Sequence, residues 1–292
     1  MPPYTRRKFI GSAIFATAGA ALLRAADEPP PWQIGCYTRP WADHDYRVGL
    51  DAIAGAGFGF AGLMTAKGGD LIKPDTPPER VAEIGTEAKS RGLRLSSVWG
   101  GNFIGKPSLA DSIARLTRLI DSAALCGSSG LLLGGTGKPE QVDDYYKAVA
   151  ECCDYAAAKG VGLSVKPHGG ANSTGRQCRQ LIEKVGHRNF GLWYDPGNIF
   201  YYSGGKIDPV DDAAAVDGLV VGMSIKDFRD PKDVNLTPGT GRVNFRGVLA
   251  RLRRGGFISG PLIVECLTPG DLPHLKAEAA KAREFVAALA GN

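Results

Sequence analysis

The sequence predicts an α/β protein that folds as a single (β/α)8 barrel. Three observations support this fold class: apolar runs alternate with amphipathic segments, the alternation repeats roughly every 30 residues, and it occurs eight times. A chain of 292 residues with 43% hydrophobic and 22% charged residues can form one barrel of about 250 residues. An open doubly wound sheet is the alternative topology.

Each predicted strand is a short apolar run of the kind that is buried in a parallel sheet. In chain order the predicted strands are Trp32–Tyr37, Phe58–Met64, Leu93–Val98, Ser129–Leu133, Gly162–His168, Phe190–Asp195, Val220–Asp227 and Pro261–Leu267. Apolar spacing of three and four residues predicts helices between them. Examples are Pro78–Arg91, Leu109–Cys126, Gln141–Lys159 and Phe245–Arg254. Glycines stand where these helices stop. Eight such units with continuous apolar strands favour a closed parallel barrel with helices outside.

The first 30 residues differ from the rest and predict an export signal. Arg6 and Arg7 precede an Ala/Gly-rich apolar run from Phe9 to Leu23, and residues 5–10 resemble a twin-arginine signal. The apolar run is shorter than the ~20 residues of a membrane-spanning helix. We therefore expect a signal and linker at residues 1–30, the barrel domain at 31–292, and export to the periplasm by the twin-arginine pathway. Contact with the membrane is expected only through this signal.

Charge and motifs exclude several function classes. Residues 1–30 contribute +2 of the net charge of +5, and outside residues 251–254 no run of Lys and Arg interleaved with aromatic residues occurs, so nucleic acid is not an expected partner. The six cysteines contain no CxxC pair, which predicts neither a disulfide framework nor a zinc framework. No GxGxxG unit follows a strand, and Pro139 interrupts the phosphate-loop pattern in residues 134–141. We expect no nucleotide cofactor, while the sequence is compatible with an oligomer.

Polar residues follow several predicted strands, at the end where a barrel carries its active site. They are Arg39, Trp99, Asn102, Lys166, His168, Asp195, Asn198, Ser224, Lys226, Asp227 and Glu265. Lys166 and His168 share one face of their strand, and two neighbouring positive charges need an anion, a metal or solvent nearby. Glu265 lies between apolar neighbours and needs a cation. We expect Lys166, His168, Asp195, Asn198, Lys226 and Glu265 to line one pocket.

The motifs around these residues resemble those of the xylose isomerase-like barrel superfamily, in its sugar phosphate isomerase/epimerase branch. The resemblance covers about residues 32–288. Residues 195–198 (DPGN) resemble the family's D-x-G-H turn, residues 224–227 (SIKD) its H-x-K-D strand, and residues 263–265 (IVE) its last ligand strand. The resemblance implies a site for a divalent metal.

The metal ligands of that family are only partly retained. Asp195 and Glu265 keep the family's ligand type, whereas Lys166, Ser224 and Asn198 replace a glutamate and two histidines. His168 could complete a set with Asp195 and Glu265 that binds Mn, Mg, Co or Zn. Alternatively, the ammonium group of Lys166 takes the place of the metal, keeps both carboxylates ionised and polarises a sugar carbonyl.

The resemblance implies an exported carbohydrate isomerase or epimerase that transfers a proton next to a sugar carbonyl. Glu265 would be the base, and His168 or Lys166 the acid. The residues expected to bind the small carbohydrate substrate are Arg39, Trp99, Asn102, Asn198, Ser224 and Lys226. A keto-sugar lyase or dehydratase of the same fold, and a non-catalytic sugar-binding barrel that has lost its metal site, are the alternatives.

Overall fold

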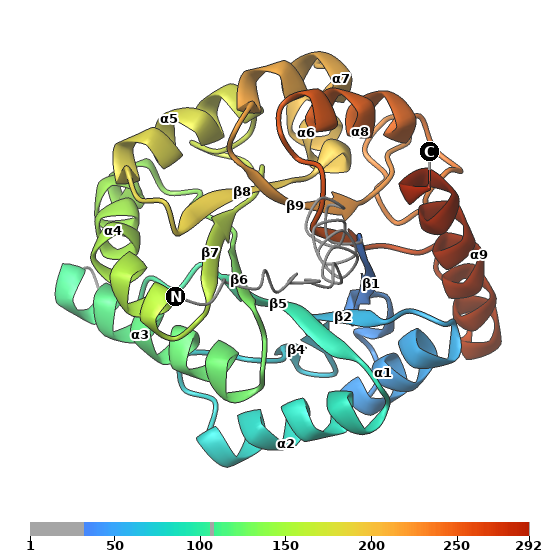
Figure 1. Cartoon of the computed structure of the whole chain (residues 1–292), viewed down its shortest axis with the longest axis horizontal. Coiled ribbons are helices and arrows are strands. Elements are labelled where there is room, and N and C mark those ends of the chain that lie inside the picture. The colour runs from blue at the N-terminus through green and yellow to red at the C-terminus, as the bar shows by residue number, and fades with distance from the viewer. Residues whose placement is uncertain (1–31, 106–107, 292) are drawn as a thin grey trace, which may run out of the picture. The chain divides into compact units, whose positions relative to one another are not determined.

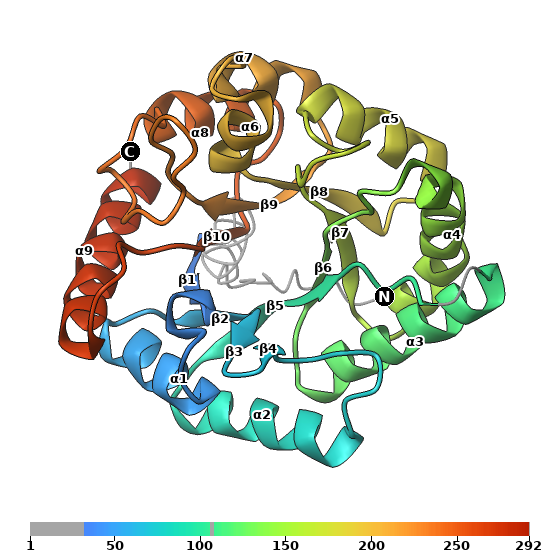
Figure 2. The same ribbon diagram turned by 180° about the vertical axis from the view of Figure 1, so that it is seen from behind.

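Parallel strands form a closed barrel in the computed structural model, which describes residues 32–105 and 108–291. The predicted export signal lies outside the described residues. Within the described part, eight strands close in the order β1-β10-β9-β8-β7-β6-β5-β2 (Figures 1 and 2). They are β1 (Gln33–Tyr37), β2 (Phe60–Leu63), β5 (Arg94–Gly101), β6 (Gly130–Leu133), β7 (Gly162–Val165), β8 (Phe190–Tyr194), β9 (Val220–Ile225) and β10 (Pro261–Val264). The predicted (β/α)8 barrel is confirmed, and the open doubly wound sheet is excluded.

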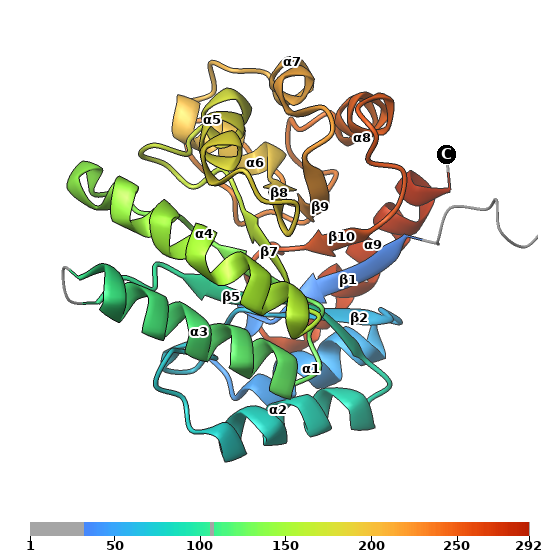
Figure 3. The ribbon, with the colours of Figure 1, turned by 60° about the vertical axis from the view of Figure 1, so that its left-hand side comes forward.

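Helices form a ring around the barrel, as the view along its axis and the side view show (Figures 1 and 3). They are α1 (Tyr46–Gly55), α2 (Pro78–Ser90), α3 (Leu109–Leu125), α4 (Val142–Ala158), α5 (Gly175–Val185), α6 (Pro196–Ser203), α7 (Pro209–Asp212), α8 (Phe245–Arg254) and α9 (Leu272–Ala290). Short 3-10 turns occur at Arg39–Trp41, Pro139–Gln141 and Ala213–Val216. No helix in the described residues has the length and apolar character needed to cross a membrane.

Some strands end earlier than their apolar runs predict. β7 ends at Val165 rather than at His168, and β10 ends at Val264 rather than at Leu267. After β7, the side-chain amide of Asn172 donates hydrogen bonds to the carbonyls of Gly134 (3.0 Å) and Lys166 (2.7 Å). A side chain thus takes over part of the hydrogen bonding of the strand ladder, and Lys166 lies in the loop at the carboxyl rim.

A two-stranded hairpin, formed by β3 (Thr65–Ala66) and β4 (Gly69–Asp70), follows β2 and was not expected. Strands of two residues are too short to produce a recognisable alternation of apolar and polar residues. The hairpin matters for function because it brings Thr65 to the carboxyl rim of the barrel.

Aromatic side chains form a small buried cluster with residues of the strands. Tyr37 and Trp193 have ring centroids 6.2 Å apart, and each ring faces a glycine of a neighbouring strand. A Cβ atom on Gly62 would lie 2.2 Å from the ring of Tyr37, and one on Gly222 would lie 2.5 Å from the ring of Trp193. Glycine is required at both positions because any side chain would displace the rings that pack there.

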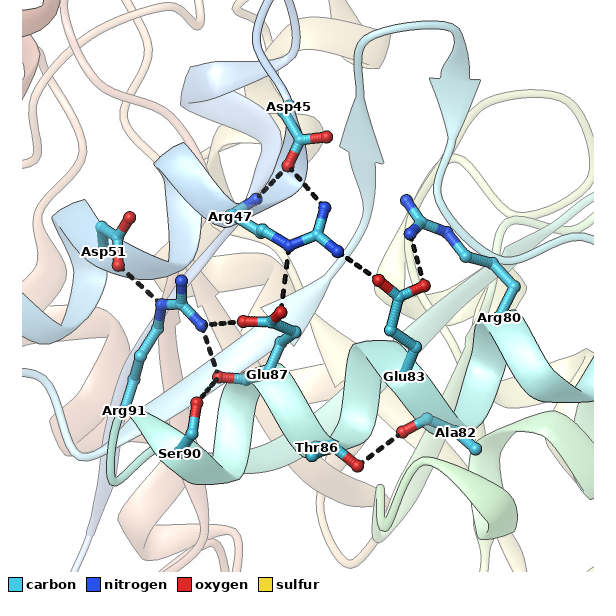
Figure 4. A network of polar contacts seen from close by, with 10 residues as sticks. All are labelled: Asp45, Arg47, Asp51, Arg80, Ala82, Glu83, Thr86, Glu87, Ser90 and Arg91. Carbon is cyan, nitrogen blue, oxygen red and sulfur yellow. Dashed lines mark hydrogen bonds and ion pairs between the residues drawn. The ribbon is translucent and has the colours of Figure 1, made fainter.

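An ion-pair network links α1 to α2 on the outer surface (Figure 4). Arg47 contacts both Glu83 and Glu87, and its Nε lies 3.0 Å from Glu87 Oε1. Arg91 bridges Glu87 to Asp51, with a distance of 2.6 Å from its Nε to Asp51 Oδ1. These groups are partly exposed, so each pair contributes roughly 1 kcal/mol or less to stability. The network fixes the position of two helices but lies outside the cavity.

Candidate active site

A cavity of about 390 Å³ opens at the carboxyl ends of the strands. Its lining residues come from loops that follow β1, β2, β7, β9 and β10, from strands β3 and β5, and from helix α6. They are Arg39, Met64, Thr65, Trp99, Lys166, His168, Asn198, Tyr201, Tyr202, Lys226, Lys232, Val234, Asn235 and Glu265. Strand direction explains this convergence, because parallel strands of a closed barrel all end at the same rim.

A buried cluster of two lysines and two carboxylates lies at this cavity. The Nζ atom of Lys166 lies 2.9 and 2.8 Å from the two carboxylate oxygens of Glu265, and 3.2 Å from Asp195 Oδ2. The Nζ atom of Lys226 lies 2.9 Å from Glu265 Oε1 and 3.9 Å from Asp195 Oδ2. All four side chains are almost fully buried, so the ion pairs are only weakly screened by water.

Neighbouring groups hold the two carboxylates in place. The hydroxyl of Ser224 donates a hydrogen bond to Glu265 Oε2 at 2.8 Å, and the indole of Trp193 donates to that hydroxyl at 3.1 Å. Asp195 caps the amino end of α6, where its Oδ1 accepts a hydrogen bond from the backbone N–H of Asn198 at 2.9 Å. The carboxylates are therefore oriented by β9 and α6 as well as by the lysines.

The charges of the cluster determine which groups are ionised. Burial raises the pKa of Glu265, but the positive charges of Lys166, Lys226 and Arg39 outweigh it and hold this pKa well below its ordinary value. Burial raises the pKa of Asp195 despite the opposing effect of both lysines. Burial would lower the pKa of Lys226, but Glu265 and Asp195 raise it above its ordinary value. Lys226 thus stays protonated at neutral pH, and Glu265 is a weak base.

His168 lies in the cavity wall between two aromatic rings. Its ring centroid is 5.3 Å from that of Trp99 and 5.8 Å from that of Tyr202. Desolvation and the nearby charges of Lys166 and Lys226 lower the pKa of His168 to about 3. The imidazole is therefore neutral at neutral pH, which explains how a lysine and a histidine can lie side by side without repulsion.

The other residues expected at the site differ in their placement. Arg39, Trp99 and Asn198 line the cavity, whereas Ser224 lies beneath it in contact with Glu265. Asn102 is exposed and is not among the lining residues. Its amide oxygen accepts from the backbone N–H of Ile104, so this side chain shapes its own loop after β5.

Several lining residues were not expected from the sequence. Thr65 reaches the cavity through the short hairpin, Tyr201 and Tyr202 through α6, and Lys232 and Asn235 through the loop after β9. None of these follows a strand directly, so the strand-end pattern does not indicate them. The aromatic pair after the DPGN turn is the one sequence signal that points toward this wall.

The comparisons with known proteins agree with this architecture. A sequence model described as "Xylose isomerase-like TIM barrel" matches residues 50–289. The chain belongs to this family. No curated protein matches the sequence at a significant level.

Solved structures similar to this xylose isomerase-like TIM barrel include sugar epimerases. A D-psicose 3-epimerase with D-tagatose from Clostridium cellulolyticum H10 has a TM-score of 0.71 at 15% identity, covering 88% of this chain and 99% of that one. An L-ribulose 3-epimerase has a TM-score of 0.69 at 16% identity, with 89% and 95% covered. A xylose isomerase-like TIM barrel protein from Mycobacterium smegmatis, in complex with magnesium, has a TM-score of 0.71 at 20% identity, with 89% and 96% covered. At these identities the likeness shows the fold alone.

The donor set of this chain does not fit a divalent metal. Among the described residues, no three His, Cys, Asp or Glu side chains form a group that could hold a metal ion. The ammonium group of Lys166 already lies within 3.2 Å of both carboxylates, and a divalent cation placed there would be repelled by it. The expected ligand set of Asp195, Glu265 and His168 is therefore corrected: a lysine stands between the two carboxylates, and His168 packs against aromatic rings.

Replacing Lys166 with glutamate is expected to create a metal site. Three buried carboxylates would repel one another, and a divalent cation would relieve that repulsion while gaining an oxygen ligand. Calorimetry with Mn²⁺ should detect binding to K166E, and Mn²⁺ should raise the Tm of this variant but not that of the wild type. Stoichiometric metal in the purified wild-type protein would contradict this interpretation of Lys166.

Proposed function

We propose that this xylose isomerase-like barrel is a carbohydrate isomerase or epimerase that works with a lysine pair in place of a metal. The observation that carries the proposal is the ammonium group of Lys166 between Asp195 and Glu265, at the wall of the cavity. Isomerisation and epimerisation next to a carbonyl both pass through an enediolate, so they require a cationic or hydrogen-bonding group near the carbonyl oxygen. The fold of sugar epimerases supports the substrate class.

Lys226 is the side chain best suited to polarise the sugar carbonyl. Lys166 directs its three N–H donors at oxygens of Glu265 and Asp195, whereas Lys226 has one short contact, to Glu265. Lys226 therefore keeps donors for a ligand in the cavity that it lines. Its raised pKa keeps it cationic, so it can stabilise a negative oxygen as the enediolate forms.

The proton-transfer group is better assigned to His168 than to Glu265. Both oxygens of Glu265 accept hydrogen bonds from Lys166, Lys226 or Ser224, and its pKa is well below the ordinary value. Because both of its oxygens are already engaged, Glu265 is poorly placed to take a proton from a sugar in the cavity. The imidazole of His168 lines the cavity in its neutral form, so a ring nitrogen that faces the sugar can accept a proton and return it later in the reaction.

Proton exchange in deuterated water tests the proposed function. The full chain would be incubated with free ketoses and 3-keto sugars, and deuterium at the carbon next to the carbonyl would be followed by NMR. Enzyme-dependent exchange with formation of an epimer or isomer is the expected result. Loss of water from the sugar would instead indicate the lyase alternative, and the absence of any exchange with any of these sugars would contradict the proposal.

A sugar-binding barrel without catalysis is the second candidate. It is favoured by one observation, which is that Glu265 is fully engaged by hydrogen bonds within the protein. Such a barrel would hold a sugar without exchanging its protons. The same incubation, combined with calorimetric binding, separates the two candidates because only an enzyme would exchange deuterium.

We also propose that the protein is exported through the twin-arginine pathway. The support is the sequence TRRKFI at residues 5–10, followed by a weakly apolar run. Changing Arg6 and Arg7 together to lysine should retain the protein in the cytoplasm, because this pathway reads the paired arginines rather than positive charge alone. Fractionation of cells that express either form is the measurement. Unchanged export of the double variant would exclude this route.

A further inference from the structure

The wall of the cavity carries more positive than negative charge. Four cationic side chains line it, which are those of Arg39, Lys166, Lys226 and Lys232. Two carboxylates oppose them: Glu265 in the wall and Asp195 buried beside it. Four positive groups less two negative groups leave an excess of two positive charges. Neutral sugars need no such excess, since hydroxyl groups are recognised by neutral donors and acceptors.

The excess resides on Arg39 and Lys232. Lys166 and Lys226 form the ion pairs with Glu265 and Asp195 described above, so this cluster is balanced internally. Within the described residues, neither Arg39 nor Lys232 has an ion pair with a carboxylate. Arg39 instead donates to Asn235 Oδ1 at 3.3 Å and contacts the thiol of Cys266, which is a weak acceptor.

Lys232 is held at the same cavity by the loop after β9. Backbone hydrogen bonds of 2.8 Å in both directions join Arg229 and Asp233, so Lys232 lies in a tight turn. Its Nζ atom lies 4.9 Å from the centroid of the Tyr201 ring. The same loop carries Asn235, which contacts Arg39. The two unpaired cations are therefore linked through one loop rather than scattered over the surface.

The nearby carboxylates are engaged elsewhere or lie apart from these cations. Asp233 pairs with Arg229 at 2.8 Å, and Asp230 pairs with Arg242 at 2.8 Å. Asp227 accepts hydrogen bonds from backbone N–H groups, including those of residues 239 and 241. Asp43 lines an adjoining cavity that also includes Arg39, and the two form no ion pair.

We propose that the sugar substrate carries an anionic group, and that Arg39 and Lys232 bind this group while Lys226 contacts the sugar carbonyl. This inference rests on the proposed function for the position of the carbonyl. The guanidinium of Arg39 offers the fork of donors that matches the two oxygens of a carboxylate, or two oxygens of a phosphate ester. The shared chemistry is thus an acidic group on a sugar.

An anionic substrate also has a consequence for His168. Burial and the surrounding positive charges lower the pKa of this imidazole, and a bound anion would cancel part of the effect of the charges. Binding of the substrate would therefore make His168 a stronger base at the moment when a proton has to be removed. A neutral sugar would leave the imidazole as weakly basic as it is in the free protein.

Calorimetric binding to the full chain tests the inference with three matched ligands. D-Fructose is the neutral ketose, D-fructuronate carries a carboxylate at carbon 6, and D-fructose 6-phosphate carries a phosphate there. We expect at least one of the two anions to bind roughly 10-fold or more tightly than D-fructose, because charge-assisted hydrogen bonds are the stronger ones. Tighter binding of D-fructuronate assigns the site to sugar acids, and tighter binding of the phosphate assigns it to phosphate esters.

Two variants and one control locate the effect. Arg39→Gln and Lys232→Gln should each remove most of the preference for the anion, measured as the ratio of its affinity to that of D-fructose. Lys232 is exposed, so its replacement leaves the fold intact even if Arg39→Gln disturbs it. Lys206→Gln is the control, because Lys206 is exposed and does not line the cavity. Added NaCl should weaken binding of the anion only.

Equal affinities of the wild type for all three ligands would overturn the inference, and so would an anion preference that survives in both variants. Failure of this inference can be distinguished from failure of the proposed function. Proton exchange on D-fructose without any anion preference would leave the isomerase proposal standing and remove this inference. Preferential anion binding without proton exchange on any sugar would support this inference and contradict the isomerase proposal.

Discussion

Replacing Lys166 with methionine is expected to lower the free energy of unfolding by about 3–5 kcal/mol. Methionine fills a similar volume but carries no charge. Glu265 would lose the donor that lies 2.8–2.9 Å from its two oxygens, and Asp195 would lose a contact of 3.2 Å. The cost is large because two buried carboxylates, both 2% exposed or less, would share a single lysine. Denaturant titration of both proteins is the measurement.

The pH dependence of this loss follows from the pKa of the carboxylates. Without Lys166, repulsion and burial raise the carboxylate pKa in the folded protein above the unfolded value. A group with a raised folded pKa contributes stability at low pH and loses it as the pH rises through the folded pKa. The destabilisation of K166M should therefore be greatest at neutral pH and smaller in acid.

Lys184→Met is the matched control for this prediction. Lys184 forms an ion pair with Asp143 at 2.6 Å, but both side chains are exposed. Its replacement should cost roughly 1 kcal/mol or less. Equal losses in K166M and K184M would contradict the view that the buried cluster is a tightly coupled charge system.

Replacing Lys226 with methionine is expected to lower kcat by about 10²–10³-fold, the usual cost of removing one donor to a developing oxyanion. Lys226 lines the cavity and keeps N–H donors that its contact with Glu265 does not use. Lys166 would still hold Glu265, so the variant should remain folded. The measurement is the rate of deuterium exchange at saturating sugar.

The division of the effect between kcat and KM distinguishes chemistry from binding. An electrophile that acts mainly in the transition state lowers kcat with a smaller change in KM, whereas a residue that only binds the sugar raises KM. Lys206→Met, at an exposed lysine that does not line the cavity, should leave both values unchanged. A variant K226M with normal kcat would exclude Lys226 as the electrophile.

The fold could be predicted from the sequence because its signal is local and repeated. Apolar runs such as the one at residues 190–194 alternate with amphipathic helices such as α8, and that alternation alone restricts the topology to a few forms. Glu265 could also be singled out, because a carboxylate between apolar residues requires a cation wherever it is buried. The need for a partner was thus evident in the sequence, which left open whether that partner is the ammonium group of Lys166 or a metal.

Tertiary structure alone decided which cation meets that carboxylate. Lys166 and Glu265 are 99 positions apart in the chain, and only barrel closure brings the amine within 2.8 Å of the carboxylate. Lys232 is brought to the cavity that Arg39 lines by the loop after β9, and its turn at residues 229–233 does not directly follow a strand. The spacing of residues in the sequence predicts contacts within a helix or a strand. Ion pairs across a barrel depend on interatomic distances that are set only when the sheet closes. For that reason the sequence indicated a site with two carboxylates, and the structure identified it as a site occupied by lysines.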